Sequence, residues 1–236
     1  MLILNLHPTS THISQIENWL IEEDNTTKSG FYCNWSIISK AFKEGNIFVI
    51  TENDYAIGFV VYALFESYAK IDIAEVMPSM RKKGIARKMI EESLAYFKKE
   101  GALVCQLFCS PVDSEPFWKK MNFINFPPFE YDDRVNMFKP LIECNKPKNK
   151  AESNTTICLW DCEPYQASRV EAKWFWDLKF EKDNNTLVSP IIFPVSKNWQ
   201  VAITIEGKNV LTTKVKRTSI DSMVHGDIMI IQKLPV

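Results

Sequence analysis

The sequence predicts an α/β domain over about the first 140 residues, followed by a small all-β domain. Strand-like and helix-like patterns alternate along the first part of the chain. A polar segment, 143–156, then carries Pro147 and three lysines without apolar periodicity, as a linker does. Beyond it, apolar residues recur at every second position. We therefore expect one domain at 1–142, a linker at 143–156 and an all-β domain of open role at 157–236.

Each element of the first domain follows from its local pattern. Helices are expected where apolar residues share one helical face, as Ile13, Ile16, Trp19 and Leu20 do. Strands are expected where short runs are apolar and β-branched. The expected order is strand 2–6, helices 11–23 and 36–43 and strands 47–51, 56–65 and 71–76. A helix then carries apolar residues from 86 to 97 and ends at 98–99, followed by strand 104–109, helix 114–121 and a final strand.

The second domain reads as a β-sandwich or a barrel-like fold. Apolar residues alternate with mostly polar neighbours over 170–180 and again over 199–205, which predicts two amphipathic strands. A turn at 207–209 leads into a strand at 210–215, and 228–231 adds the last one. The alternating tryptophans of the first strand are typical of buried core, although an aromatic ligand platform has the same pattern.

The segment Arg81-Lys-Lys-Gly-Ile-Ala-Arg87 joins the strand at 71–76 to the next helix. Such a turn brings together free backbone N–H groups, the positive end of the helix dipole and three basic side chains, and this combination attracts phosphate. Gly84 lets the backbone approach a ligand, and Ala86 is small enough for close packing behind the loop. A solvated basic turn has the same composition, so the segment alone leaves both interpretations open.

Three motifs together resemble the GNAT superfamily of acetyltransferases. The stretch 81–86 resembles its R/Q-x-x-G-x-G/A signature, and Val76-Met77-Pro78 resembles the end of its fourth strand. The stretch 117–123, Phe-Trp-Lys-Lys-Met-Asn-Phe, is similar to its F-Y-x-K-x-G-F segment. The resemblance covers about the first 140 residues. It implies a GNAT fold, with a central mixed, mostly antiparallel sheet whose fourth strand splays away from its neighbour.

The resemblance also implies an activity: direct transfer of acetyl from acetyl-CoA to an amine-bearing acceptor, either a small molecule or a protein, without a metal. In this family the motif binds the cofactor's pyrophosphate, and the splayed strand holds its pantetheine arm. The residues that match these positions are Val76, Met77, Arg81, Lys82, Lys83, Gly84, Ile85, Ala86 and Arg87. Members of the family often dimerise, so a homodimer is one of the expected states.

A general base must take a proton from the attacking amine. Asp72 occupies the position where many family members carry a glutamate, so we expect it to be this base, with Glu75 in reserve. Simple strand alternation would place Lys70, Asp72, Ala74 and Val76 on one face and Ile71, Ile73 and Glu75 on the other. An ion pair between Asp72 and Lys70 is the structural alternative for this carboxylate.

Two positions depart from the family pattern. Trp118 stands where a tyrosine often protonates the departing thiolate, and an indole N–H is far too weak an acid to replace it. Pro111 replaces an asparagine that often holds the pantetheine arm. These departures keep two alternatives open: a non-catalytic acyl-CoA-binding or sensory module, and an interaction protein that uses the GNAT domain as a scaffold.

Composition and charge argue against several classes of protein. A net charge of −1 argues against a dedicated nucleic-acid binder. The longest apolar run, at 59–65, has seven residues and is too short to span a membrane. The stretch at 1–6 has no basic segment and is too short an apolar run for a signal peptide, so we expect a cytoplasmic protein with no membrane association. The six scattered cysteines predict free thiols rather than a disulfide framework or a zinc site. The acidic stretch 130–133 fits a cationic acceptor, and an exposed acidic loop fits it equally well.

Overall fold

The computed structural model describes residues 1–28, 30–128, 134–218, 223–224 and 227–234. The chain folds as two compact units. The first consists of Met1–Asn125 and Arg134–Leu141, and the second contains Ile142–Val236. Within the described ranges, no helix is both long enough and apolar enough to cross a membrane.

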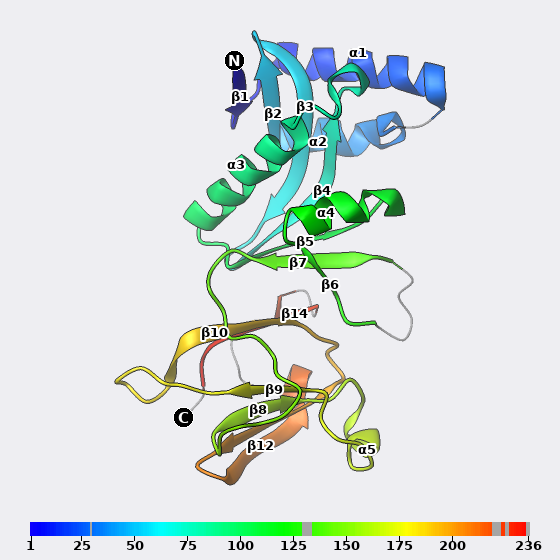
Figure 1. The fold of residues 1–236 in the computed structure, drawn as a ribbon. Coiled ribbons are helices and arrows are strands. Elements are labelled where there is room, and N and C mark those ends of the chain that lie inside the picture. Colours follow the sequence, from blue (N-terminus) through cyan, green and yellow to red (C-terminus); the bar gives the residue numbers. More distant parts are fainter. Residues whose placement is uncertain (29, 129–133, 219–222, 225–226, 235–236) are drawn as a thin grey trace. The chain divides into compact units, whose positions relative to one another are not determined.

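The first unit is built on a seven-stranded sheet in the order β1-β2-β3-β4-β5-β7-β6 (Figure 1). The strands are β1 (Leu2–Asn5), β2 (Ile47–Glu52), β3 (Tyr55–Leu64), β4 (Tyr68–Val76), β5 (Val104–Phe108), β6 (Ile124–Asn125) and β7 (Asn136–Pro140). Neighbouring strands are antiparallel except for β4 and β5, which run parallel. The expected mixed, mostly antiparallel sheet is confirmed.

Helices cover both faces of this sheet (Figure 1). The helices are α1 (Ser10–Thr27), α2 (Trp35–Glu44), α3 (Ile85–Lys99) and α4 (Glu115–Lys120). Ile16 and Leu20 of α1 are fully buried in a cluster with Phe59 of β3, on the face that α1 and α2 cover. Met89 and Phe97 of α3 are fully buried on the opposite face. Each such side chain contributes about 1.5–3 kcal/mol to stability by leaving water.

The parallel pairing of β4 with β5 is short. Among the described residues it joins Tyr68–Lys70 to Val104–Gln106, and the two strands separate beyond that point. The rest of β4 stays paired with β3 on its other side, as far as Val76 opposite Gly58. The second half of β4 therefore presents an open backbone edge toward β5, as the resemblance implied.

A β-bulge interrupts β4 at Asp72. Ile71 lies opposite Tyr62 and Ile73 opposite Val61, so Asp72 is the extra residue. An extra residue reverses the alternation of side chains beyond it. Ile71 accordingly packs in the core under α3, whereas Ile73 packs in the core under α1 and α2. The prediction that Ile71 and Ile73 share one face was therefore wrong.

The second unit consists of two antiparallel sheets around one core. One sheet has the order β12-β11-β8-β9 and the other the order β10-β14-β13. The strands are β8 (Thr156–Leu159), β9 (Trp174–Asp177), β10 (Thr186–Pro194), β11 (Gln200–Ile205), β12 (Lys208–Lys214), β13 (Met223–Val224) and β14 (Ile228–Lys233). Trp176 and Val201 of the first sheet share a buried cluster with Ile191 and Ile231 of the second. Trp176 is fully buried, which confirms the core interpretation of this tryptophan.

The local predictions for this unit differ from the structure in several elements. The strand expected over 170–180 is confined to β9, and Val170 before it is 54% exposed. A short helix, α5 (Pro164–Ala167), and the long strand β10 were not predicted. β10 contains Pro190 and Pro194, and its sequence is untypical of a strand because proline normally argues against one. The segment expected as a linker contacts this unit, since Lys148 bridges to Phe175 and pairs with Asp177 at 2.7 Å.

Candidate functional site

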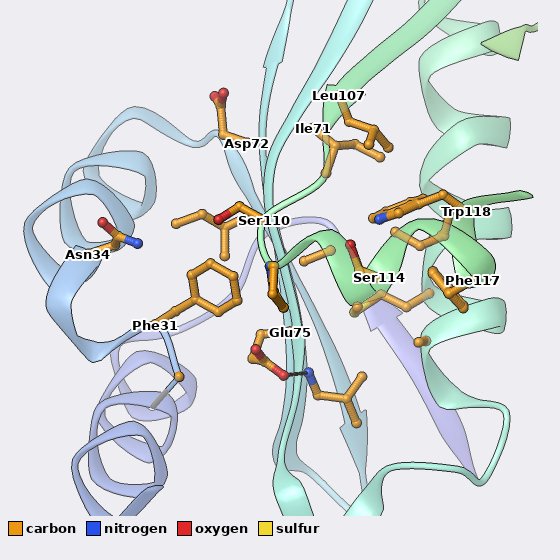
Figure 2. A pocket seen from close by; sticks show the side chains of 18 of the residues that line it. Phe31, Asn34, Ile71, Asp72, Glu75, Leu107, Ser110, Ser114, Phe117 and Trp118 are labelled. Carbon is orange, nitrogen blue, oxygen red and sulfur yellow. Dashed lines mark hydrogen bonds between the residues drawn. The ribbon is translucent and has the colours of Figure 1, made fainter. Parts of the chain in front are cut away.

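A cavity of about 670 Å³ opens in the first unit where β4 and β5 separate. Its walls come from β4, the end of β5, the loop before α4, α4 itself, the start of α3 and the segment that follows α1. Figure 2 shows Phe31 and Asn34 on one side of it and Phe117 and Trp118 on the other, with Glu75 between them. A cavity of this size is typical of a site for a small ligand.

The turn before α3 has the backbone of an anion site. Lys82 and Gly84 both adopt left-handed conformations, with φ of 64° and 79°. Gly84 is the N-cap of α3, and no side chain caps the N-terminus of this helix. The space that a Cβ at position 84 would occupy is open. The first N–H groups of a helix have no intrahelical partners, and turns of this kind form anion-binding concavities. Backbone donors and the helix dipole thus meet at this turn.

The predicted cofactor residues contribute in different ways. Val76, Arg81 and Ala86 line the cavity. Ile85 is buried in the core under α3, so only its backbone faces the turn. Lys83 and Arg87 make local contacts, with Met80 and Glu91 respectively. Lys82, Gly84 and Met77 lie in the segment that connects β4 to α3. The structure thus brings three of the nine residues to the cavity wall, and the other six lie in the turn between β4 and α3 or in the first turn of α3.

The side chain of Arg81 is bound to protein groups. Its Nη2 donates to Glu23 Oε1 at 2.6 Å and to Glu75 Oε1 at 2.9 Å, and its Nε donates to the carbonyl of Val76 at 2.9 Å. The sequence had suggested that this charge joins those of Lys82 and Lys83 at the phosphate. The guanidinium instead neutralises buried carboxylates, because these need a charged partner more than an exposed phosphate does.

Glu75 is a largely buried carboxylate at the centre of the cavity. Its side chain is only 13% exposed, and its Oε1 accepts hydrogen bonds from Arg81 and from the backbone N–H of Val76. Burial raises the pKa of Glu75, although Arg81 and the Val76 N–H pull it in the other direction. A carboxylate with a raised pKa is a stronger base than an exposed one.

Asp72, the predicted base, has a different environment. Its carboxylate is about one-third exposed and forms an ion pair of 2.7 Å with Lys70. It lines the cavity, but it lies apart from Glu75 in Figure 2. The structural alternative considered for this residue, a pair with Lys70, is thus present.

Several residues of the site were missed. Glu23 of α1 reaches the cavity from far along the sequence, and Phe31 and Asn34 come from the segment between α1 and α2. Ser110 and Ser114 bring hydroxyl groups from the loop before α4 (Figure 2). These residues carry no motif; the one signal for Glu23 was a carboxylate beside the apolar face of α1. The acidic stretch 130–133 falls outside the described residues.

Trp118 closes one wall of the cavity. It is buried and packs edge-on against Phe117 and Phe123. Trp118 thus contributes apolar surface to the cavity. Among the residues that the structure describes, no cluster of histidine, cysteine and carboxylate side chains could hold a metal ion.

Comparison with known proteins identifies the first unit. Residues 11–123 match the family described as the acetyltransferase (GNAT) family. A comparison with curated proteins found no match.

Solved structures similar to this chain include a GNAT-family protein from Desulfovibrio desulfuricans, which is 12% identical in sequence. That match has a TM-score of 0.50 and covers 60% of this chain and 100% of the other. A GNAT acetyltransferase from Bacillus cereus is 16% identical (TM-score 0.48, 59% of this chain and 97% of that one). The PaiA N-acetyltransferase from Thermoplasma acidophilum, solved with coenzyme A, is 15% identical (TM-score 0.48, 59% and 99%). The first unit of this chain thus contains a domain of the GNAT acetyltransferase family at residues 11–123.

Proposed function

We propose that this protein is an acetyl-CoA-dependent N-acetyltransferase that moves the acetyl group directly to an amine acceptor. The observation that carries the proposal is the cavity itself. On a GNAT domain, it runs from the separation of β4 and β5 to an N-terminus of α3 that no side chain caps. The end at the N-terminus of α3 suits a phosphate group, and the end between β4 and β5 suits an extended chain.

Different residues would bind different parts of acetyl-CoA. The backbone N–H groups from Lys82 to Arg87 and the ammonium groups of Lys82 and Lys83 would hold the diphosphate at the positive end of α3. The open edge of β4 next to Val76 and Met77 would bind the pantetheine arm, because an unpaired strand edge offers both donors and acceptors to an extended ligand. Gly84 keeps the approach to these N–H groups open.

Glu75 is the better candidate for the general base, and Asp72 becomes the reserve. When bound, acetyl-CoA supplies an activated thioester. Glu75 Oε2 would take the proton from the acceptor amine as nitrogen bonds to the acetyl carbon and the carbon–sulfur bond breaks. The hydroxyls of Ser110 and Ser114 can pass a solvent proton to the departing sulfur, which is a tolerable leaving group because thiols ionise near pH ~8.5.

A second candidate function is a non-catalytic acyl-CoA-binding module. Trp118 favours it: by the sequence resemblance it stands where a tyrosine often donates a proton, and the structure gives it a buried ring that packs against Phe117. In this case acetyl-CoA would bind with the same residues, and no amine would be acetylated.

We assign the proposed transferase activity to residues 1–142 and keep 157–236 as a separate domain of open role, acting in the cytoplasm. The test is release of the CoA thiol by the full-length protein with acetyl-CoA and a panel of primary amines. Release that depends on both components supports the enzyme. Binding of acetyl-CoA without release for any amine supports the second candidate.

A further inference from the structure

Glu23 lines the cavity and is a buried carboxylate with one unused oxygen. Its side chain is 3% exposed. Oε1 accepts a hydrogen bond from Arg81, but Oε2 has no hydrogen-bond partner among the described residues and is shielded from water. A buried, unsatisfied charged oxygen is costly, and the cost is removed when a ligand supplies the donor.

The charges around Glu23 leave a negative excess. Of the described residues that line the cavity, Arg81 is the one with a cationic side chain, against the carboxylates of Glu23, Asp72 and Glu75. Lys70 balances Asp72. The single guanidinium of Arg81 is shared by Glu23 and Glu75 through the same nitrogen. With both carboxylates ionised, one negative charge stays uncompensated.

The attacking amine cannot compensate this charge. An amine attacks the thioester only after it has lost its proton, so at the moment of reaction its nitrogen is neutral. Glu75, as the base, must also be ionised beforehand. The positive charge that Glu23 lacks must therefore come from another group on the acceptor.

The surroundings of Glu23 suit an ammonium group. Phe31 contributes an aromatic ring to the same cavity, and aromatic rings attract cations. Gly30 passes directly against the carboxylate, since a Cβ at this position would lie 3.0 Å from Oε2. A larger residue at position 30 would displace the carboxylate from this wall.

We infer that the acceptor carries a second ammonium group in addition to the amine that is acetylated, and that Glu23 binds it. The inference rests on the proposed N-acetyltransferase function. It defines the acceptor as a polycationic amine and makes Glu23 a specificity-determining residue.

The experiment compares straight-chain diamines with the amino alcohols of the same chain length, which replace the second ammonium by a hydroxyl group. Thiol release gives kcat/KM for each pair with the full-length protein. A hydrogen bond to a charged group is worth about 1.5–3 kcal/mol, so we expect the best diamine to exceed its amino alcohol by at least about tenfold. In Glu23→Gln, which keeps the shape and the contact with Arg81, this ratio should fall close to unity.

Two controls separate the possible failures. Glu44→Gln removes an exposed carboxylate of α2 that pairs with Lys40, and it should leave the ratio unchanged. Binding of acetyl-CoA should be the same in Glu23→Gln and in the unmodified protein. Turnover of diamines and amino alcohols at equal kcat/KM in the unmodified protein overturns this inference and leaves the transferase standing. A preference that survives Glu23→Gln also overturns it, and no turnover of any amine overturns the transferase as well.

Discussion

Arg81, the first residue of the phosphate-loop motif, donates a hydrogen bond of 2.9 Å to Glu75 on β4. The same nitrogen donates to Glu23 on α1, and Arg81 Nε binds the carbonyl of Val76. One side chain thus connects the turn before α3, the open end of β4 and α1. Arg81 therefore links the turn expected to bind the cofactor phosphates to the candidate base through hydrogen bonds.

Glu75→Gln should remove most of the catalytic rate. The amide keeps the size of the side chain but cannot take a proton, and general-base catalysis contributes roughly 10²–10⁴-fold. We expect kcat to fall within this range while the Kd for acetyl-CoA changes little. Steady-state thiol release and calorimetric binding measure the two quantities.

Asp72→Asn is the matched variant for this test. It breaks the ion pair with Lys70, which is partly exposed and contributes less than about 1 kcal/mol. The rate should therefore fall much less than in Glu75→Gln. If Asp72→Asn shows the larger loss of kcat, the base is Asp72, as the sequence suggested, and our assignment of Glu75 is wrong.

The pH dependence of activity should report the raised pKa of Glu75. The base must be ionised, so kcat/KM should increase with pH through this pKa, above the ordinary glutamate range near pH ~4.3. Folding stability should change in the opposite direction. A glutamate whose pKa is raised by folding stabilises the fold at low pH, and this contribution is lost as pH rises through the raised pKa. The difference in unfolding free energy between the unmodified protein and Glu75→Gln, measured against pH, should show this slope; a flat difference would contradict it.

Gly84→Ala should weaken acetyl-CoA binding by about tenfold, or 1.4 kcal/mol. The new methyl group would enter the open space through which a phosphate approaches the α3 N-terminus. The substitution also forces alanine into a left-handed conformation, which costs about 1 kcal/mol of stability.

Gly45→Ala separates the two effects. Gly45 ends α2 with φ of 75° and also has open space at its Cβ position, so it has the same backbone strain away from the cavity. Isothermal calorimetry and thermal unfolding should show equal loss of stability in the two variants and a change of Kd in Gly84→Ala alone. Equal Kd values for Gly84→Ala and Gly45→Ala would show that the turn before α3 is not part of the cofactor site.

Gly58→Ala should destabilise the first unit by about 1–3 kcal/mol, because it overpacks a closed part of the sheet. A Cβ at position 58 would lie 2.8 Å from the carbonyl oxygen of Glu75 and 3.1 Å from a methyl group of Ile50. The backbone of β4 would have to shift at Glu75, so kcat should fall together with stability. Urea unfolding measures the first effect; a loss below about 0.5 kcal/mol would contradict the close approach.

The sequence predicted the first unit well because its signals are local. The helical spacing of Met89 and Phe97 and the turn around Gly84 depend on near neighbours, and both are found where expected. The bulge at Asp72 depends on how β4 pairs with β3, and no local pattern in β4 reveals it. The face on which each β4 side chain lies could therefore not be predicted beyond this point.

The site was predicted only where a motif marks it. Glu23 and Arg81 are separated by 58 positions and meet only because the fold brings α1 next to the turn before α3. Charge near the turn suggested that Arg81 binds phosphate, whereas burial of two carboxylates, visible only in the fold, directs it elsewhere. In the second unit, β10 was not predicted, and its two prolines make its sequence untypical of a strand.

The most direct test of the central claim is a thermal-shift measurement of the full-length protein with acetyl-CoA, with CoA and with ATP. Ligand at about a hundred times its Kd stabilises a protein by roughly 2.7 kcal/mol, which is several degrees in Tm. The cavity between β4, β5 and the α3 N-terminus predicts a clear shift with acetyl-CoA and CoA, none with ATP, and a reduced shift in Gly84→Ala. No shift with acetyl-CoA at any concentration would contradict both the transferase and the acyl-CoA-binding module.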